Sequence, residues 1–188
     1  MTHPPSARSW RRRAGCLAAL ALGLLALAPW QAQAQPTLTE AQAKAGFILN
    51  FARYVEWPAT AFVSREAPVV ACLLERDALV GALGALEGRL VQGRPLKVRR
   101  SFTADDTHGC HVVFIGEADE RRIVPVLRSL AGQPVLTIGD AERFVDLGGA
   151  IGLVLGDERL QFDVNRGVLE QAQLKASASL LKLARSVQ

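Results

Sequence analysis

The segment Gly109–Gly116 most constrains how this chain of 188 residues can fold. It contains four consecutive apolar residues, Val112–Ile115, three of them β-branched, a pattern typical of a β-strand buried on both faces. The same segment holds Cys110 and His111, from a chain with three cysteines and three histidines. A neighbouring Cys and His are compatible with a nucleophile, a metal site or a purely structural role.

Residues 1–34 have the organisation of a secretory signal peptide. Four arginines precede the apolar run Ala14–Ala28, and Ala32-Gln33-Ala34 fits a small-x-small cleavage site. The run is shorter than the roughly 20 residues that span a bilayer, so a membrane anchor is the weaker interpretation. We expect cleavage after Ala34, loss of Cys16 with the peptide, and a single exported domain of residues 35–188.

The net positive charge of the chain comes from this segment. Residues 1–34 hold four of the 22 basic residues and none of the 18 acidic ones, so 18 of each remain. The rest of the chain shows no basic run interleaved with aromatic residues, so we expect no nucleic-acid partner.

Beyond residue 35, apolar strands alternate with helices. This alternation predicts a mostly parallel sheet covered on both faces, a three-layer α/β sandwich that ends in an antiparallel hairpin. The predicted helices are 37–57, 77–86, 119–130, 140–145 and 165–187, and the predicted strands are 68–74, 94–102, 109–116, 135–138, 150–155 and 159–164.

Local signals refine these elements. Thr37 and Thr39 each fit a capping box, and Trp57-Pro58 should end the first helix. Polar alternation predicts an edge position for strand 94–102. Pro125 should kink its helix or fall in the first turn. We expect Asp140 to cap helix 140–145, and helix 165–187 to be interrupted near 175–177. The expected inward residues of that last helix are Leu180, Leu181, Leu183, Ala184 and Val187.

Two cysteines, Cys72 and Cys110, remain after signal-peptide removal. An even count in an exported chain favours a disulfide over free thiols, and both residues lie in predicted strands that could be neighbours. Such a bond would contribute roughly 3–4 kcal/mol to stability. No Cys-x-x-Cys motif is present, which argues against a thiol oxidoreductase.

Other catalytic and metal chemistry finds little support. His108 and His111, with two aspartates just before them, could be metal ligands, but no third suitably spaced ligand appears and a polar loop with a hydrogen-bonded histidine is favoured. A nucleophile elbow and a phosphate-binding glycine loop are both missing. Asp140 and Asp146 could act as an acid–base pair, although capping and solvation explain them more simply. We expect no catalytic residue, no metal and no cofactor.

Three residues are candidates for contact with a partner or ligand. Tyr54 and Trp57 lie near the end of the first helix, where their polar tips can reach water. Asp140 follows a predicted strand at the end of the sheet where ligand crevices form in α/β folds.

Several segments, taken in order, resemble the YfiR-like family of exported proteins. The resemblance covers residues 40 to 187, nearly the whole chain after the signal peptide. The segments that carry it are Lys44–Pro58, Gly109–Ile115, Leu136–Asp140, Phe144 with Gly148-Gly149, Phe162–Asn165 and Leu180–Ala184.

This resemblance implies a periplasmic, non-enzymatic protein that represses a membrane-bound diguanylate cyclase by binding its periplasmic sensor domain. Repression would lower cyclic-di-GMP signalling and biofilm formation. The resemblance also implies a homodimer and an outer-membrane lipoprotein partner. Of the two disulfides that it implies, Cys72 and Cys110 match one, and the second has no cysteine near Gly148-Gly149. The alternative is a periplasmic small-ligand-binding protein, with a crevice near Gly139 and Asp140, that feeds a membrane sensor such as a histidine kinase.

Overall fold

The computed structural model describes residues 38–74, 78–103, 105–116, 120–156 and 159–188. The predicted signal peptide, its cleavage site and the capping box at Thr37 lie outside these residues. So do Asp77 and Asp119, the first residues of two predicted helices, and Asp157, which lies between the predicted strands 150–155 and 159–164. In the part of the chain that the structure describes, no helix combines the length and hydropathy of a membrane-spanning segment.

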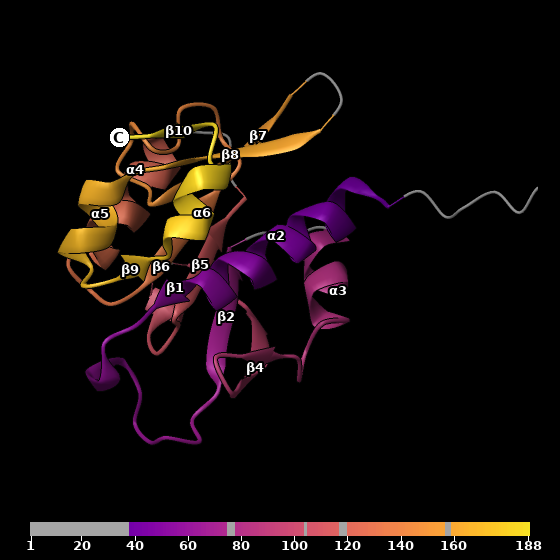
Figure 1. Ribbon diagram of the computed structural model, residues 1–188, viewed down its shortest axis with the longest axis vertical. Coiled ribbons are helices and arrows are strands. Elements are labelled where there is room, and N and C mark those ends of the chain that lie inside the picture. The colour runs from indigo at the N-terminus through magenta and orange to yellow at the C-terminus, as the bar shows by residue number, and fades with distance from the viewer. Residues whose placement is uncertain (1–37, 75–77, 104, 117–119, 157–158) are drawn as a thin grey trace, which may run out of the picture. The chain divides into compact units, whose positions relative to one another are not determined.

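An eight-stranded sheet forms the centre of the fold, with strand order β10-β8-β7-β6-β5-β2-β4-β3 (Figure 1). The five strands from β4 to β7 pair in parallel, and β8 closes the predicted antiparallel hairpin with β7. The sheet is therefore mostly parallel, as predicted. The strands are β2 (Val69–Leu74), β3 (Leu90–Val91), β4 (Arg94–Arg100), β5 (Val112–Ile115), β6 (Leu136–Gly139), β7 (Ile151–Leu155), β8 (Leu160–Val164) and β10 (Ser186–Val187).

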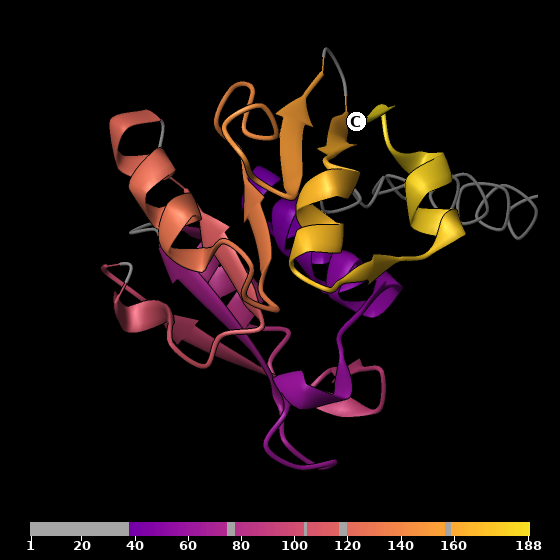
Figure 2. The same cartoon turned by 90° about the vertical axis from the view of Figure 1, so that its left-hand side faces the viewer.

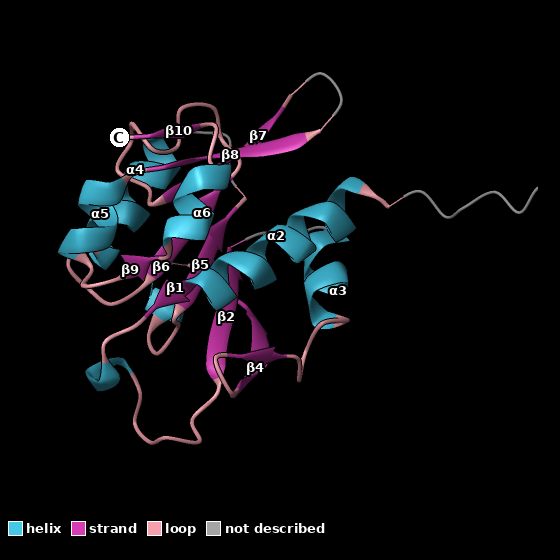
Figure 3. Cartoon of the chain, in the orientation of Figure 1, coloured by secondary structure: helices cyan, strands magenta, loops and turns pink. Residues whose placement is uncertain are grey.

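Helices cover both faces of the sheet, which confirms the three-layer prediction (Figures 2 and 3). Strand β5 sends Val112 and Phe114 into the larger core and Val113 and Ile115 into the smaller one. This alternation is what a central strand requires. The larger core is covered by α2 (Glu40–Tyr54), α3 (Ala78–Gly84), α5 (Arg166–Gln171) and α6 (Ala178–Leu183), and the smaller one by α4 (Glu120–Leu130).

Helix α2 begins at the predicted capping box. The Thr39 hydroxyl accepts from the Gln42 backbone N–H, and the Gln42 side chain accepts from the Thr39 N–H. The helix ends at Tyr54, three residues before the predicted end. The reason is that β1 (Val55–Glu56) leaves the helix to pair antiparallel with β9 (Lys175–Ala176) in a separate two-stranded sheet.

Two local predictions are wrong, and a third is wrong in one of its two alternatives. Strand β4 is not the edge of the sheet, because a tight turn at Gln92-Gly93 folds β3 back along its outer side. Pro125 is the sixth residue of α4, so its predicted place in the first turn is wrong, whereas the alternative of a kink stays a prediction. Asp140 does not cap a helix, because residues 141–148 form turns, and Arg143 has a φ of 57°.

The predicted last helix, 165–187, is interrupted more than expected. It consists of two short helices, α5 and α6, separated by β9 and followed by β10. Leu180 is buried, and Leu181 and Ala184 pack against the core, as predicted. Leu183 is 74% exposed and Val187 46% exposed, so their predicted inward orientation is wrong. The cause is that α6 ends at Leu183 and the chain then becomes β10 beside β8.

Candidate functional site

The structure joins Cys72 and Cys110 in the disulfide that the cysteine count predicts. Cys72 belongs to β2 and Cys110 precedes the neighbouring strand β5, and their Cα atoms lie 5.9 Å apart. Both side chains are buried in the smaller core. The bond therefore ties two adjacent central strands together.

His111 fills a structural position at the amino end of β5. Its Nδ1 accepts a hydrogen bond of 3.1 Å from the Val70 backbone N–H, and its Nε2 lies 3.1 Å from the Ala61 carbonyl oxygen. Because an N–H can only donate, Nδ1 is the unprotonated nitrogen and Nε2 carries the hydrogen. Burial, and secondarily the nearby Arg94 cation, lowers the pKa of His111.

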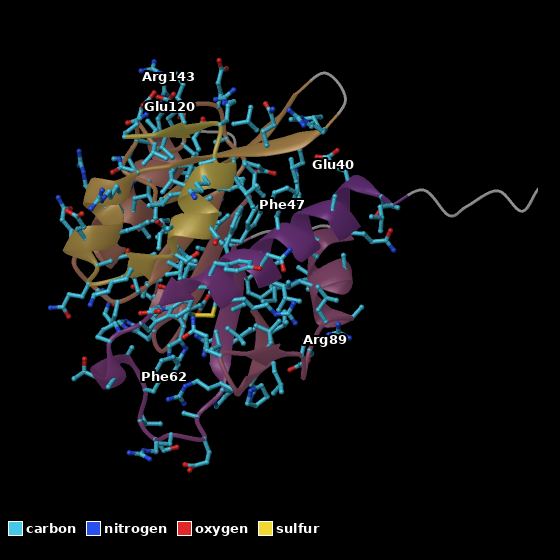
Figure 4. The ribbon with its side chains drawn as sticks, viewed as in Figure 1. Glu40, Phe47, Phe62, Arg89, Glu120 and Arg143 are labelled. Carbon is cyan, nitrogen blue, oxygen red and sulfur yellow. A yellow bond between two sulfur atoms is a disulfide. The ribbon has the colours of Figure 1, made fainter. Side chains whose placement is uncertain are left out.

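The ring of His111 also supports the segment between β1 and β2, residues 57–68, which we call the connector. Phe62 of the connector stacks on His111 with ring centroids 4.4 Å apart (Phe62 is labelled in Figure 4). On Phe62 in turn lies the Arg94 guanidinium, 3.8 Å from its centroid. Arg94 also donates to the carbonyl oxygens of Ser64 and Ala67.

The polar loop before Cys110 is ordered by its own side chains rather than arranged for a ligand. The Asp106 carboxylate accepts from the backbone N–H groups of Phe102 and Thr103, and these bonds, with the Thr103 hydroxyl, lower its pKa. Arg99 donates to the carbonyl oxygens of Asp106 and His108. Among the described residues, no group of three or more His, Cys, Asp or Glu side chains is placed to hold a metal ion.

Trp57, one of the three predicted contact residues, lines a groove on the surface. Its Nε1–H donates to the His111 carbonyl oxygen, 3.3 Å away, and the ring is partly buried. It lines a groove of about 530 Å³, which we call the Trp57 groove. The other lining residues are Glu56, Pro58, Glu170, Gln173, Leu174 and Lys175.

The Trp57 groove combines an apolar floor with charged residues of both signs. Trp57, Pro58 and Leu174 supply the apolar surface, while Glu170 and Lys175 are exposed. Protein interfaces are commonly anchored by an aromatic side chain within such a polar rim. Tyr54, the other aromatic candidate, is 47% exposed at the nearby end of α2.

Asp140 lies at the opposite end of α2 from Trp57. Its carboxylate pairs with Lys44, which also pairs with Glu40. Ten residues of helix separate Lys44 from Tyr54, about 15 Å. The three predicted contact residues therefore do not form one site, since Asp140 stands apart from Tyr54 and Trp57.

A second groove, the Asp140 groove, has a volume of about 490 Å³. The carboxylates of Asp146 and Asp163 line it together with Asp140. Gln188 and Arg143 lower the pKa of Asp146, and Arg185 and Ser186 lower that of Asp163. Because these two carboxylates stay ionised, they suit a role as fixed charges in the groove wall better than a role in proton transfer near neutral pH.

Sequence reasoning missed most of the residues that complete these grooves. Glu170 and Lys175 of the Trp57 groove come from the predicted final helix, and Lys44, which pairs with Asp140 without lining its groove, lies 96 residues from it in the sequence. No local pattern marks such pairs. Arg94 carried one available signal, since it begins a strand with unusually many basic residues.

The sequence profile of the YfiR/HmsC-like family matches residues 41–185. The chain belongs to this family. The match begins in α2, ends just before β10 and includes the disulfide, the Trp57 groove and all of the Asp140 groove except Ser186 and Gln188. The family is a regulatory one, and membership together with the disulfide favours the periplasm.

Two solved structures share the fold. A conserved domain protein from Vibrio cholerae O1 biovar El Tor is 10% identical with a TM-score of 0.50 over 80% of this chain. The ABC domain from Streptococcus pneumoniae, in complex with L-Trp, is 9% identical with a TM-score of 0.52 over 77%. The matches cover 61% and 60% of those chains. At these identities the similarity concerns the fold alone.

Proposed function

We propose that this chain is a periplasmic, non-enzymatic repressor that binds the periplasmic sensor domain of a membrane-bound diguanylate cyclase. Repression lowers cyclic-di-GMP signalling and biofilm formation. The observation that carries this proposal is the match to the YfiR/HmsC-like family over residues 41–185. The disulfide supports the compartment, because oxidising conditions outside the cytoplasm let such bonds persist.

We assign the contact with the sensor to the Trp57 groove and the adjacent Tyr54. The groove offers a partly exposed indole beside charged groups, and an apolar side chain of the partner would fill it. Its volume of about 530 Å³ accommodates one large side chain with neighbouring backbone. A homodimer and an outer-membrane lipoprotein that relieves repression belong to the same proposal.

The experiment is a titration of the purified chain, beginning at Gln35, with the purified periplasmic domain of the diguanylate cyclase. Lys175→Gln neutralises a rim charge, and Lys182→Gln neutralises an equally exposed lysine on α6. We expect Lys175→Gln to weaken binding several-fold and Lys182→Gln to leave it unchanged. Binding that both variants weaken equally would remove the Trp57 groove from the proposal, and absence of binding by the unaltered chain would remove the repressor function.

A second candidate function is supported by the Asp140 groove. Its volume of about 490 Å³ lies within the range of small-molecule sites. Its walls carry fixed positive and negative groups, Arg185 and Asp163 among them, which suit a polar, zwitterionic ligand. In this case the chain would carry a small ligand to a membrane sensor such as a histidine kinase. A thermal-shift screen that finds no stabilising metabolite would argue against it.

A further inference from the structure

The connector, residues 57–68, is held to the sheet through the His111 imidazole ring and the Arg94 side chain. Of this segment, η2 (Ala59–Ala61) is the regular part, and Val63 at its middle is fully exposed. Its attachments converge on His111 and on the stacked pair Phe62 and Arg94. A short segment with so few buried side chains depends on those attachments for its position.

The hydrogen bond at Nδ1 of the His111 ring requires the neutral form, whereas the Nε2–H can donate to the Ala61 carbonyl oxygen in either form. Nδ1 accepts from the Val70 N–H, so a proton added at Nδ1 would face a second donor at 3.1 Å. The His111 residue is only 9% exposed, so the new charge would gain little hydration. The neutral ring therefore fits this position, and the imidazolium does not.

The charged group that acts on the ring is Arg94, which reaches it from β4 across Phe62. Other elements that contact His111 contribute backbone groups: Val70 of β2, Ala61 of η2 and Leu136 of β6, whose N–H donates to the His111 carbonyl oxygen. The Arg94 cation opposes protonation, and among the described residues no carboxylate forms an ion pair with the ring. Protonation thus brings two cations onto the two faces of one phenyl ring.

We propose that His111 is an acid-sensitive latch whose protonation releases the connector and displaces Trp57 at its start. The ordinary pKa of histidine is 6.5, and that of His111 is lowered, so the latch is closed at neutral pH and opens only in more acidic surroundings. If the Trp57 groove is the sensor-binding surface, as in the proposed function, acid would weaken binding; the latch itself does not depend on that assignment.

The chain provides its own probe for this proposal. Of its three tryptophans, Trp57 alone lies in residues 35–188, and His108 and His111 are the two histidines there. We expect the intrinsic fluorescence of the chain from Gln35 to shift reversibly between about pH 7.5 and about pH 5, with a midpoint below the ordinary histidine value and an unchanged far-UV circular dichroism spectrum. His111→Gln should abolish the shift. The matched control His108→Gln, an exposed histidine three residues away, should retain it.

A shift that persists in His111→Gln, a shift that His108→Gln removes, or no shift at all would overturn the latch. Fluorescence that changes only together with loss of the circular dichroism signal would also overturn it, since the transition would then be global unfolding. NMR on the unaltered chain is independent of whether His111→Gln folds. The Trp57 indole signal should follow the titration of the His111 ring; an indole that follows His108 would contradict the proposal.

Discussion

At the scale of single residues, Gly139 and Gly149 are needed because both lie against the ring of Phe144. A Cβ atom at Gly149 would lie 2.0 Å from Phe144 Cε1, and one at Gly139 would lie 2.3 Å from Cε2. The fully buried Phe144 ring therefore occupies the space that side chains at these positions would need. The sequence shows that glycines are present, but not which ring lies against them.

Gly149→Ala should accordingly destabilise the fold by roughly 1–3 kcal/mol, because the ring must move within a packed core. Gly46→Ala is the matched control: no atom lies within 4 Å of a Cβ there, and the position is inside α2. It should stabilise the fold by about 0.5–1 kcal/mol. Urea denaturation measures both, and equal effects of the two substitutions would contradict the clamped position of Phe144.

A second residue-scale prediction concerns Asp163, whose carboxylate pairs with both nitrogens of the Arg185 fork. The Arg185 side chain lowers the pKa of Asp163 in the folded state. A carboxyl with a lowered folded pKa stabilises fully above its unfolded pKa, near 4, and loses that contribution as the pH falls through the folded value. The stability difference between the unaltered chain and Asp163→Asn should therefore be greatest at neutral pH and vanish in acid. A difference independent of pH, measured by urea denaturation, would contradict the ion pair.

At the scale of elements, the sequence predicts helices and strands that depend on a local pattern. It does not predict strands that depend on pairing with a segment far along the chain. Continuous apolar runs predicted β2, β5 and β6, and Thr39 with Gln42 predicted the start of α2. The two-residue strands β1, β9 and β10 were missed, because each exists only through a partner far along the chain. The residues that line the Trp57 groove come from segments that are likewise far apart in the sequence, so the sequence did not predict the groove.

The N-terminus of α5 offers a prediction at this scale. Asn165 Oδ1 accepts from the Val168 N–H, and its Nδ2 donates to the Val145 carbonyl oxygen. Asn165→Ala removes both bonds and should cost about 1–2 kcal/mol, whereas Asn165→Asp keeps the capping oxygen and should cost less. Thermal or urea denaturation measures which of the two variants is more stable. An alanine variant as stable as the aspartate variant would show that the capping oxygen contributes nothing to stability.

At the scale of the whole molecule, the disulfide links β2 and β5 at the centre of the sheet, beneath α4. The bonded cysteines are 38 residues apart, so the closed loop should contribute about 3–4 kcal/mol in the chain-entropy model. Adding a reductant should lower the urea midpoint of the unaltered chain by a corresponding amount. The Cys72→Ala/Cys110→Ala variant should not respond to reductant, and an unaltered chain that also failed to respond would contain free thiols.

The fold class and the disulfide could be predicted from the sequence because alternating apolar runs and an even cysteine count are properties of the whole chain. The site could be predicted only in part. The position of Tyr54 and Trp57 near one end of α2 could be predicted and their contact role stays a prediction, whereas Asp140 lies at the other end of α2, paired with Lys44.

Repression of a membrane-bound diguanylate cyclase is the central claim, and the cyclic-di-GMP concentration in the native host tests it most directly. Deleting the gene should raise that concentration, and complementation with the unaltered chain or with Lys182→Gln should restore it. Lys175→Gln, which alters the rim of the Trp57 groove, should restore it incompletely. An unchanged cyclic-di-GMP concentration after deletion would contradict the repressor function.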